Sequence, residues 1–72
     1  MISVDLLNNL KSVRRRRGLS QTDLGNIIGV SQNTISSIET GQYCPSAKTA
    51  ALLCKALQCK FEELFFLKEV NE

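Results

Sequence analysis

The spacing of apolar residues along the first quarter of the chain predicts a helix. Leu6, Leu10 and Val13 follow one another at i, i+4 and i+7, which places them on one face of a helix over residues 5–17. Ser3 precedes this segment and is a candidate N-cap. We therefore expect the chain to open with a helix that buries one apolar stripe.

Capping residues and helix breakers predict four further helices. Ser20 and Asp23 have the spacing of a capping box, and Gly29 ends the helix that they open. Ser31 is placed to cap a third helix over residues 32–40. A fourth helix is expected from Pro45-Ser46 to about Leu57, and a fifth with Phe61, Leu64 and Phe65 on its inner face. No segment alternates with a period of two, so the sequence predicts an all-α fold of five short helices.

Composition narrows the class of protein. The chain has 72 residues, 43% of them hydrophobic and 22% charged, which fits one globular domain over residues 1–72. Histidine is absent and the three cysteines form no CxxC pair, so we expect no metal site, no cofactor and no enzymatic activity. The apolar runs are too short to span a membrane. Reduced thiols and the lack of a signal peptide favour a cytoplasmic protein.

Residues 21–40 have the pattern of a helix-turn-helix, the unit that places its second helix in the major groove of DNA. Two short helices are joined by a brief turn, and five apolar side chains fall where the helices would share a core: Leu24, Ile28, Val30, Ile35 and Ile38. Gly25 leaves room for a close approach of the backbone, and Gly29 suits the positive φ of the turn.

From about Leu10 to Phe65 the sequence resembles the Cro/repressor-type, or xenobiotic-response-element, helix-turn-helix family of phage and bacterial regulators. The resemblance rests on Arg14, Gly18-Leu19-Ser20-Gln21, Leu24, Gly29-Val30-Ser31, Ile35, Ile38-Glu39-Thr40-Gly41, Pro45-Ser46, Leu57 and Leu64-Phe65. It implies a lambda-repressor-like DNA-binding domain and double-stranded operator DNA as the partner.

The resemblance and the position in the helix both place Gln32 and Asn33 at the groove-facing start of the third helix. Amide side chains can pair with the edge of adenine. Ser37, Thr34 and Ser36 are further candidates for base contacts. The alternative is that these polar residues are only solvated.

The resemblance also assigns roles around the recognition helix. Arg14 and Glu39 match a structural ion pair of the family, and Gln21 matches a glutamine that braces the recognition helix and contacts a phosphate. The alternative for Gln21 is that it only caps or fills the first turn of the second helix. Gln42 and Tyr43 follow the recognition helix, where side chains and exposed backbone N–H groups suit phosphate binding. Tyr43 has the alternative of covering the edge of the core. Arg17 is a further candidate for a backbone contact, with a solvated helix end as the alternative.

Two features depart from the family pattern. No basic residue lies between Arg17 and Lys48, and the net charge of the whole chain is only +2, so few cations are placed to contact phosphates. In addition, Leu52, Phe66, Leu67 and Val70 are left over once the core is filled. Surplus apolar surface of this kind usually marks a protein interface. The alternative is that Leu67 or Val70 covers the first helix.

The sequence therefore predicts a sequence-specific DNA-binding transcriptional regulator, a small repressor or Cro-like protein. It is expected to act as a homodimer or as a heteromer with another regulator. The alternative is a protein-binding modulator of another regulator, such as an antirepressor, co-repressor or antitoxin-like partner. The neutral recognition helix and the surplus apolar residues keep that alternative open.

Overall fold

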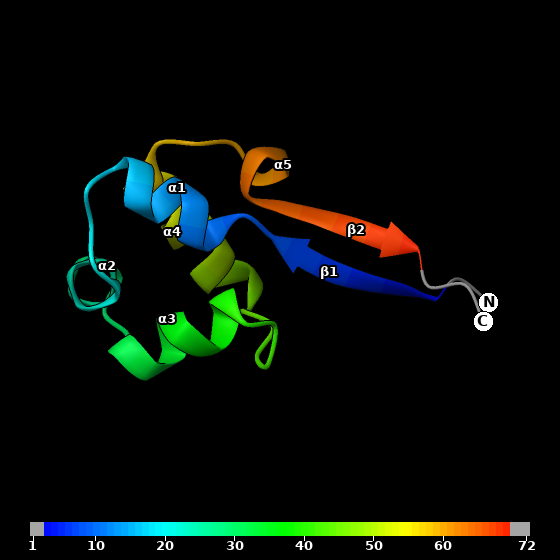
Figure 1. Cartoon of the computed structure of the whole chain (residues 1–72), viewed down its shortest axis with the longest axis horizontal. Helices are drawn as coiled ribbons and strands as arrows, with labels where there is room; N and C mark the ends of the chain where they lie inside the picture. Colours follow the sequence, from blue (N-terminus) through cyan, green and yellow to red (C-terminus); the bar gives the residue numbers. More distant parts are fainter. Residues whose placement is uncertain (1–2, 70–72) are drawn as a thin grey trace.

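Five helices and a two-stranded antiparallel sheet make up the structure, a computed structural model that describes residues 3–69. In chain order the elements are β1 (Val4–Asn8), α1 (Leu10–Arg16), α2 (Gln21–Ile28), α3 (Gln32–Glu39), α4 (Ala47–Leu57), α5 (Phe61–Leu64) and β2 (Phe65–Glu69). The helices form a body from which the β1–β2 ribbon projects at one end (Figure 1). The five helices and the lambda-repressor-like DNA-binding fold are confirmed. Within the described residues no helix has the length and apolarity needed to cross a membrane.

Serine side chains begin three of the helices. The Ser20 hydroxyl accepts a hydrogen bond from the Asp23 backbone N–H at 2.9 Å, and the Asp23 carboxylate accepts one from the Ser20 N–H at 3.0 Å. This reciprocal pair is the predicted capping box, and it satisfies two backbone donors at the start of α2. Ser31 caps α3 as expected, and Ser46 caps α4 in the same way. Each helix of the helix-turn-helix therefore begins where the sequence predicted.

The N-terminal segment was expected to be helical from residue 5, and this is wrong. Residues 4–8 form β1, which pairs with β2 in a register that sets Leu6 opposite Leu67. The first helix begins only at Leu10, and the Asn8 side chain joins this junction to α3. The Asn8 side chain accepts from the Leu10 N–H at 3.0 Å and donates to the Ile38 carbonyl at 2.9 Å. Ser3, the expected N-cap, lies outside any helix.

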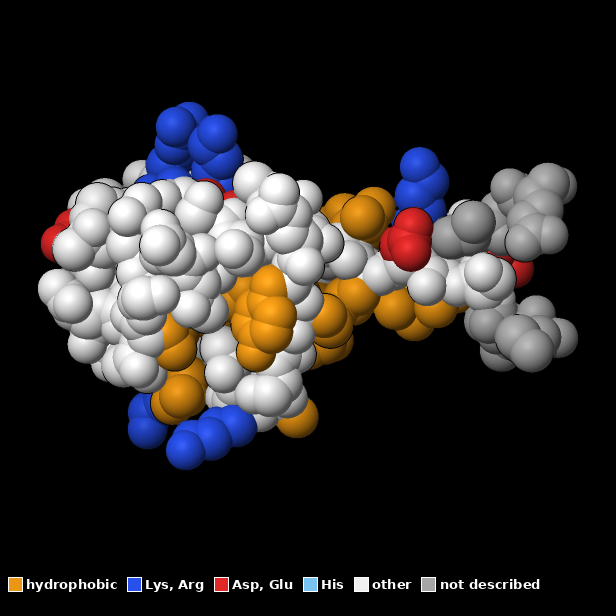
Figure 2. All heavy atoms as spheres, turned by 90° about the horizontal axis from the view of Figure 1, so that it is seen from below, with side chains coloured by type: hydrophobic (Ala, Val, Ile, Leu, Met, Phe, Trp, Pro, Cys, Tyr) orange, Lys and Arg blue, Asp and Glu red, His pale blue; other side chains and the backbone are white. Residues whose placement is uncertain are grey.

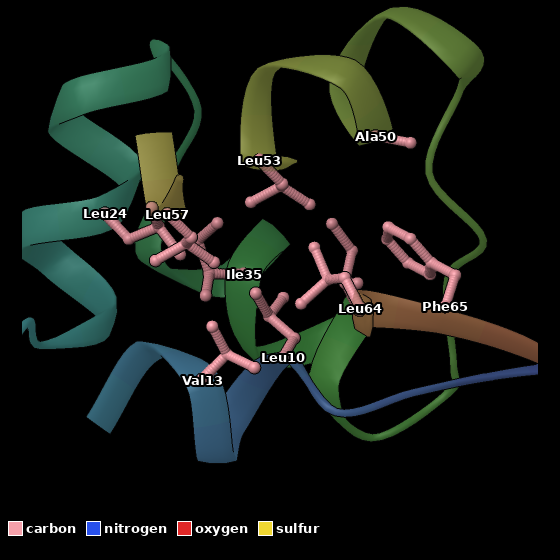
Figure 3. Packing of buried hydrophobic residues seen from close by; sticks show 10 residues of the cluster. Leu10, Val13, Leu24, Ile35, Ala50, Leu53, Leu57, Leu64 and Phe65 are labelled. Carbon is pink, nitrogen blue, oxygen red and sulfur yellow. The ribbon is translucent and has the colours of Figure 1, made fainter. Parts of the chain in front are cut away.

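The core gathers side chains from all five helices and the start of β2 (Figure 3). Its ten buried hydrophobic residues are Leu10, Val13, Leu24, Ile35, Ile38, Ala50, Leu53, Leu57, Leu64 and Phe65. Ile28 and Val30, also expected inside, are partly buried against this cluster. The expectation for Phe61 is wrong, because its side chain is exposed and stacks on Phe65 with 5.1 Å between ring centroids. The core fixes α3 against α1 and leaves its far side free.

The turn between α2 and α3 depends on two glycines. A Cβ atom on Gly25 would lie 2.6 Å from the carbonyl oxygen of Val30, so no larger residue fits without a shift of the backbone. Gly29 has φ 81°, a left-handed conformation that favours glycine. The N–H groups of Gly29 and Val30 both donate to the Gly25 carbonyl, at 2.8 and 2.9 Å. The close approach at Gly25 thus packs the helix against its own turn.

Candidate nucleic-acid interface

The exposed surface of α3 carries uncharged polar side chains. Successive residues of a helix are rotated by about 100°, so Asn33, Ser36 and Ser37 lie opposite the buried Ile35 and Ile38. Asn33 is exposed, and the two serines are half-buried. This surface is the predicted reading face, and it offers hydrogen-bond donors and acceptors without a net charge.

The remaining candidates for base contacts differ in exposure and in the hydrogen bonds that they already make. Gln32 is exposed at the first position of α3. The hydroxyl of Thr34 lies 3.0 Å from that of Ser31, within the cap of the helix. A hollow brings Thr34 together with Asn33, Ser37 and Tyr43. Tyr43 lies in the loop after α3 and was predicted to contact a phosphate. The structure places it next to the reading face.

A chain of hydrogen bonds connects α1 to the first residue of α3. Arg14 Nε lies 2.6 Å from Glu39 Oε2, so the expected ion pair is present. Glu39 Oε1 accepts from Gln21 Nε2 at 3.0 Å, and Gln21 Oε1 accepts from Gln32 Nε2 at 2.8 Å. Arg14 also donates to the Leu19 carbonyl at 2.8 Å. The position of the Gln32 side chain is thus tied to a charge pair in the interior.

The charges of this network are fixed by their surroundings. Burial alone would raise the pKa of Glu39, but hydrogen bonds from Arg14 and Gln21 and the positive charge of nearby Lys11 outweigh burial, so the pKa lies below its ordinary value. The hydrogen bond to Glu39 likewise raises the pKa of Arg14. Both side chains are at least nine-tenths buried. Glu39 is therefore ionised at neutral pH, and its charge is paired before any ligand arrives.

The loop after α3 differs from the expectation. Backbone N–H groups at Gln42 and Tyr43 were expected to be free for phosphate, but both donate to the carbonyl oxygen of Ser37, at 2.9 and 3.1 Å. These bonds satisfy a carbonyl at the C-terminal end of α3, where no helical partner follows. Only the side chains of Gln42 and Tyr43, both exposed, remain available for a DNA contact.

The phosphate contact expected of Arg17 does not fit the structure. Its guanidinium donates to the carbonyl oxygens of Leu57 and Gln58, at 2.9 and 3.4 Å. Those carbonyls lie at the C-terminal end of α4, where a cation complements the helix dipole. Arg17 therefore joins α1 to α4 rather than facing the recognition helix, which sequence spacing alone did not reveal.

Three other basic residues, not assigned from the sequence, lie close to α3. A hollow beside α1 is lined by Lys11, Arg15 and Arg16 and reaches Glu39 at the end of α3. Figure 2 looks onto the side where α3 lies in Figure 1, and it shows a mainly uncharged surface with Lys and Arg at two opposite margins. The signal in the sequence was the i, i+4 spacing of Lys11 and Arg15.

The predicted apolar patch is divided by the structure. Phe66 and Leu67 are exposed as expected, but they are neighbours in β2 and so point to opposite faces of the ribbon. Leu52 is half-buried in α4, so its place in an exposed patch is corrected. Val70 lies outside the described residues. The strands add two exposed apolar residues that the helical expectation missed, Val4 and Leu7.

Comparison with known proteins agrees with this geometry. A helix-turn-helix family model, HTH_3, matches residues 10–64. The chain is 44% identical over 64 residues to the uncharacterized HTH-type transcriptional regulator YgzD of Bacillus subtilis, covering 89% of this chain and 97% of that protein.

The solved structures that are similar at 30% identity or more include the following two. The restriction-modification controller protein C.AhdI from Aeromonas hydrophila is 30% identical with a TM-score of 0.71, over 75% of this chain and 82% of that one. The DNA-binding domain of the P22 c2 repressor is 32% identical with a TM-score of 0.70, over 74% of this chain and 70% of that one.

The fold, with α3 as the exposed second helix of the helix-turn-helix, defines a DNA-binding helix-turn-helix protein. The chain belongs to the HTH_3, or Cro/C1-type, family of helix-turn-helix transcriptional regulators. This family is non-enzymatic. The comparisons therefore confirm the family and the class of function, and leave the contacts of individual side chains as predictions.

Proposed function

We propose that the protein is a repressor-like regulator that recognises a specific operator, reading the major groove with α3 and acting as a dimer. The observation that carries this proposal is the bracing of Gln32. Its Nε2 donates one N–H to Gln21. The second N–H and the side-chain carbonyl oxygen of Gln32 are left for a ligand. Those two groups are what a glutamine needs to pair bidentately with adenine. Gln32 thus presents an adenine-reading edge while held by the chain from Arg14.

Asn33 completes the reading surface, with Ser36, Ser37 and Thr34 as further contacts. Asn33 is exposed at the middle of the free side of α3. Ser37 lies one turn further along and shares a hollow with Asn33 and Tyr43. The side chains of Gln21, Gln42 and Tyr43 border this surface and contact the DNA backbone in this proposal.

Lys11 and Arg15 supply the positive charge that the helix-turn-helix itself lacks. Both line the hollow that reaches Glu39 at the end of α3. Because Glu39 is paired with Arg14, its charge does not repel a phosphate at this margin as an unpaired carboxylate would. The proposal therefore assigns base readout to neutral amides and phosphate binding to α1.

The test is selection of binding sites from random DNA, followed by affinity measurements on the selected site and its single-base variants. For Gln32→Ala and Asn33→Ala we expect about 1–3 kcal/mol less discrimination at defined base pairs, with little change on unrelated DNA. Asn26→Ala is the matched control, because it removes an exposed amide from α2 outside the reading face.

Equal loss on every sequence would contradict base readout by these residues. If the unaltered protein binds no DNA at all, the proposal fails, and the alternative of a modulator that binds another regulator takes its place.

A further inference from the structure

We propose that Cys54 and Cys59 form a redox-active dithiol, which low-molecular-weight disulfides oxidise reversibly to an intramolecular disulfide at the C-terminal end of α4. This modification site involves no residue of the reading face and needs neither DNA nor a second copy of the chain. Both cysteines are free thiols in the structure. Where the surroundings keep thiols reduced, a disulfide is usually transient and serves redox sensing.

The way in which α4 ends brings the two cysteines together. Gln58 has φ 53°, a left-handed conformation, and its N–H donates to the Lys55 carbonyl at 3.3 Å. The next N–H, that of Cys59, donates to the Cys54 carbonyl at 3.1 Å. These two bonds define a Schellman motif, in which the side chains of the two residues joined by the outer bond frequently contact each other. In this chain that contact is made by two thiols, where most helices have a pair of apolar side chains.

The outer hydrogen bond also limits the distance between the two residues. The path from the Cα atom of Cys54, through its carbonyl oxygen and the N–H of Cys59, to the second Cα atom contains one hydrogen bond of 3.1 Å. Standard bond lengths then keep the two Cα atoms within about 7 Å of each other. Disulfides span Cα distances of about 4.4–6.8 Å. The backbone therefore already holds the pair close to the spacing that a disulfide requires.

The two side chains are close enough to influence each other. Burial raises the pKa of the Cys54 thiol, and the neighbouring thiol of Cys59 raises it further. Both side chains are half-buried and pack against the hydrophobic core, so they are ordered but not sealed from a small reagent. The third cysteine, Cys44, is exposed and lines a separate hollow beside β1. Proximity thus selects one pair among the three thiols.

Cys59 is the thiol that a reagent reaches first. It lines a hollow together with Arg16, Arg17 and Glu63, so two guanidinium groups face one carboxylate there. The net positive charge of this hollow attracts an anionic disulfide, such as glutathione disulfide with its carboxylates. Cys54 is the second thiol to react, because its raised pKa keeps it protonated at neutral pH.

The oxidation consists of two thiol–disulfide exchanges. The Cys59 sulfur attacks one sulfur of glutathione disulfide, which forms a mixed disulfide and releases one glutathione thiol. The Cys54 sulfur then attacks the Cys59 sulfur of that mixed disulfide and releases the second glutathione thiol. Two electrons pass from the protein to the reagent, and the two protons that the cysteines lose are balanced by those on the two glutathione thiols. An excess of reduced glutathione reverses both steps.

The disulfide fixes a junction on which two helices depend. It closes a loop that contains Leu57 and Gln58, whose carbonyl oxygens accept the hydrogen bonds of Arg17 from the end of α1. A cross-link restricts the unfolded chain, and the folded backbone already holds the pair at the required spacing. The oxidised protein is therefore expected to unfold at a higher temperature than the reduced protein.

The test is equilibration of the full, reduced chain with mixtures of oxidised and reduced glutathione, followed by mass spectrometry, peptide mapping and thermal unfolding. The unaltered protein is expected to lose about 2 Da at the pair, with a peptide that links Cys54 to Cys59 and a raised melting temperature. Cys44→Ser, the matched control, is expected to form the same link, whereas Cys59→Ser is expected to form none. In urea the equilibrium constant for closure is expected to fall about tenfold or more, because the stability that a disulfide adds to a fold equals the stability that the fold adds to the disulfide.

Several results would each overturn the proposal. They are a pair that stays reduced in an excess of glutathione disulfide, separate glutathione adducts on Cys54 and Cys59, and a disulfide that joins Cys44 to either of them. A closure that is equally favourable in urea would do the same, since the fold would then contribute nothing to it. Because no DNA takes part, none of these outcomes depends on the proposed function.

Discussion

The guanidinium of Arg14 serves the fold and the reading face at once. It pairs with Glu39 at the end of α3 and donates to the Leu19 carbonyl before α2. Because Gln21 donates to that carboxylate and Gln32 in turn donates to Gln21, a change at Arg14 alters how Gln32 is held. A residue distant from the DNA is therefore expected to affect sequence discrimination.

Removal of either partner of the ion pair is predicted to lower the free energy of unfolding by about 3–5 kcal/mol, since it leaves an uncompensated buried charge. Urea denaturation of Arg14→Ala, Glu39→Ala and the double variant measures this, and the double variant is expected to lose less than the sum. Arg15→Ala, an exposed neighbour, is the control. Strict additivity would show that the two side chains are not coupled.

The pH dependence of stability gives a second readout of the same pair. The pKa of Glu39 is lowered in the folded state, so its contribution is complete above its ordinary value of 4.5 and is lost as pH falls through the lower folded value. Glu39→Gln removes the titrating group. Below pH 4.5 this variant is expected to show a flatter decline in stability than the unaltered protein, and an identical decline would contradict the assignment.

At the scale of elements, sequence signals were reliable where they are local. Serine caps and the turn glycine act within four residues, and α2, α3 and α4 begin where they predict. The ribbon was missed because β1 and β2 lie at opposite ends of the chain and their pairing is tertiary. Its apolar residues occupy both faces, so neither strand alternates, and Leu6 fits a helical pattern equally well. The role of Arg17 was missed for the same reason, since its partner, the Leu57 carbonyl, lies 40 residues further along the chain. The loop N–H groups bond to the backbone carbonyl of Ser37, a partner that side-chain types do not indicate.

Any side chain at Gly25 is predicted to destabilise the packing of α2 against the turn that follows it. Gly25→Ala places a Cβ atom 2.6 Å from the Val30 carbonyl oxygen, and overpacking of this kind costs about 1–3 kcal/mol. Asn26→Ala, at the next and exposed position of α2, is expected to change the free energy of unfolding by no more than about 0.5 kcal/mol. Thermal and urea unfolding compare the two variants. A Gly25→Ala protein as stable as the control would show that the turn moves aside without cost.

At the scale of the whole molecule, the charge distribution limits how DNA is held. The segment between Arg17 and Lys48 holds no cation, Arg14 is buried in its ion pair, and Arg17 is bound to α4. Arg16 also borders a second hollow, together with Arg17 and Glu63, so phosphate binding in the proposed dimer depends on Lys11 and Arg15 of each copy, at the margin of α3. Specificity and affinity are thus carried by different elements, α3 for the first and α1 for the second.

The dependence of operator affinity on salt measures this division directly. Each phosphate contact contributes a slope of about −0.9 in log K against log [salt], so two contacts per copy predict a slope of about −4 for the dimer. Lys11→Gln removes one contact from each copy and is expected to bring the slope to about −2 without changing the preferred sequence. Lys60→Gln removes the same charge at the start of α5, on the side of the body away from α3 (Figure 1), and is the control. A slope near −10 for the unaltered protein, or equal effects of the two substitutions, would show that cations other than those of α1 hold the DNA.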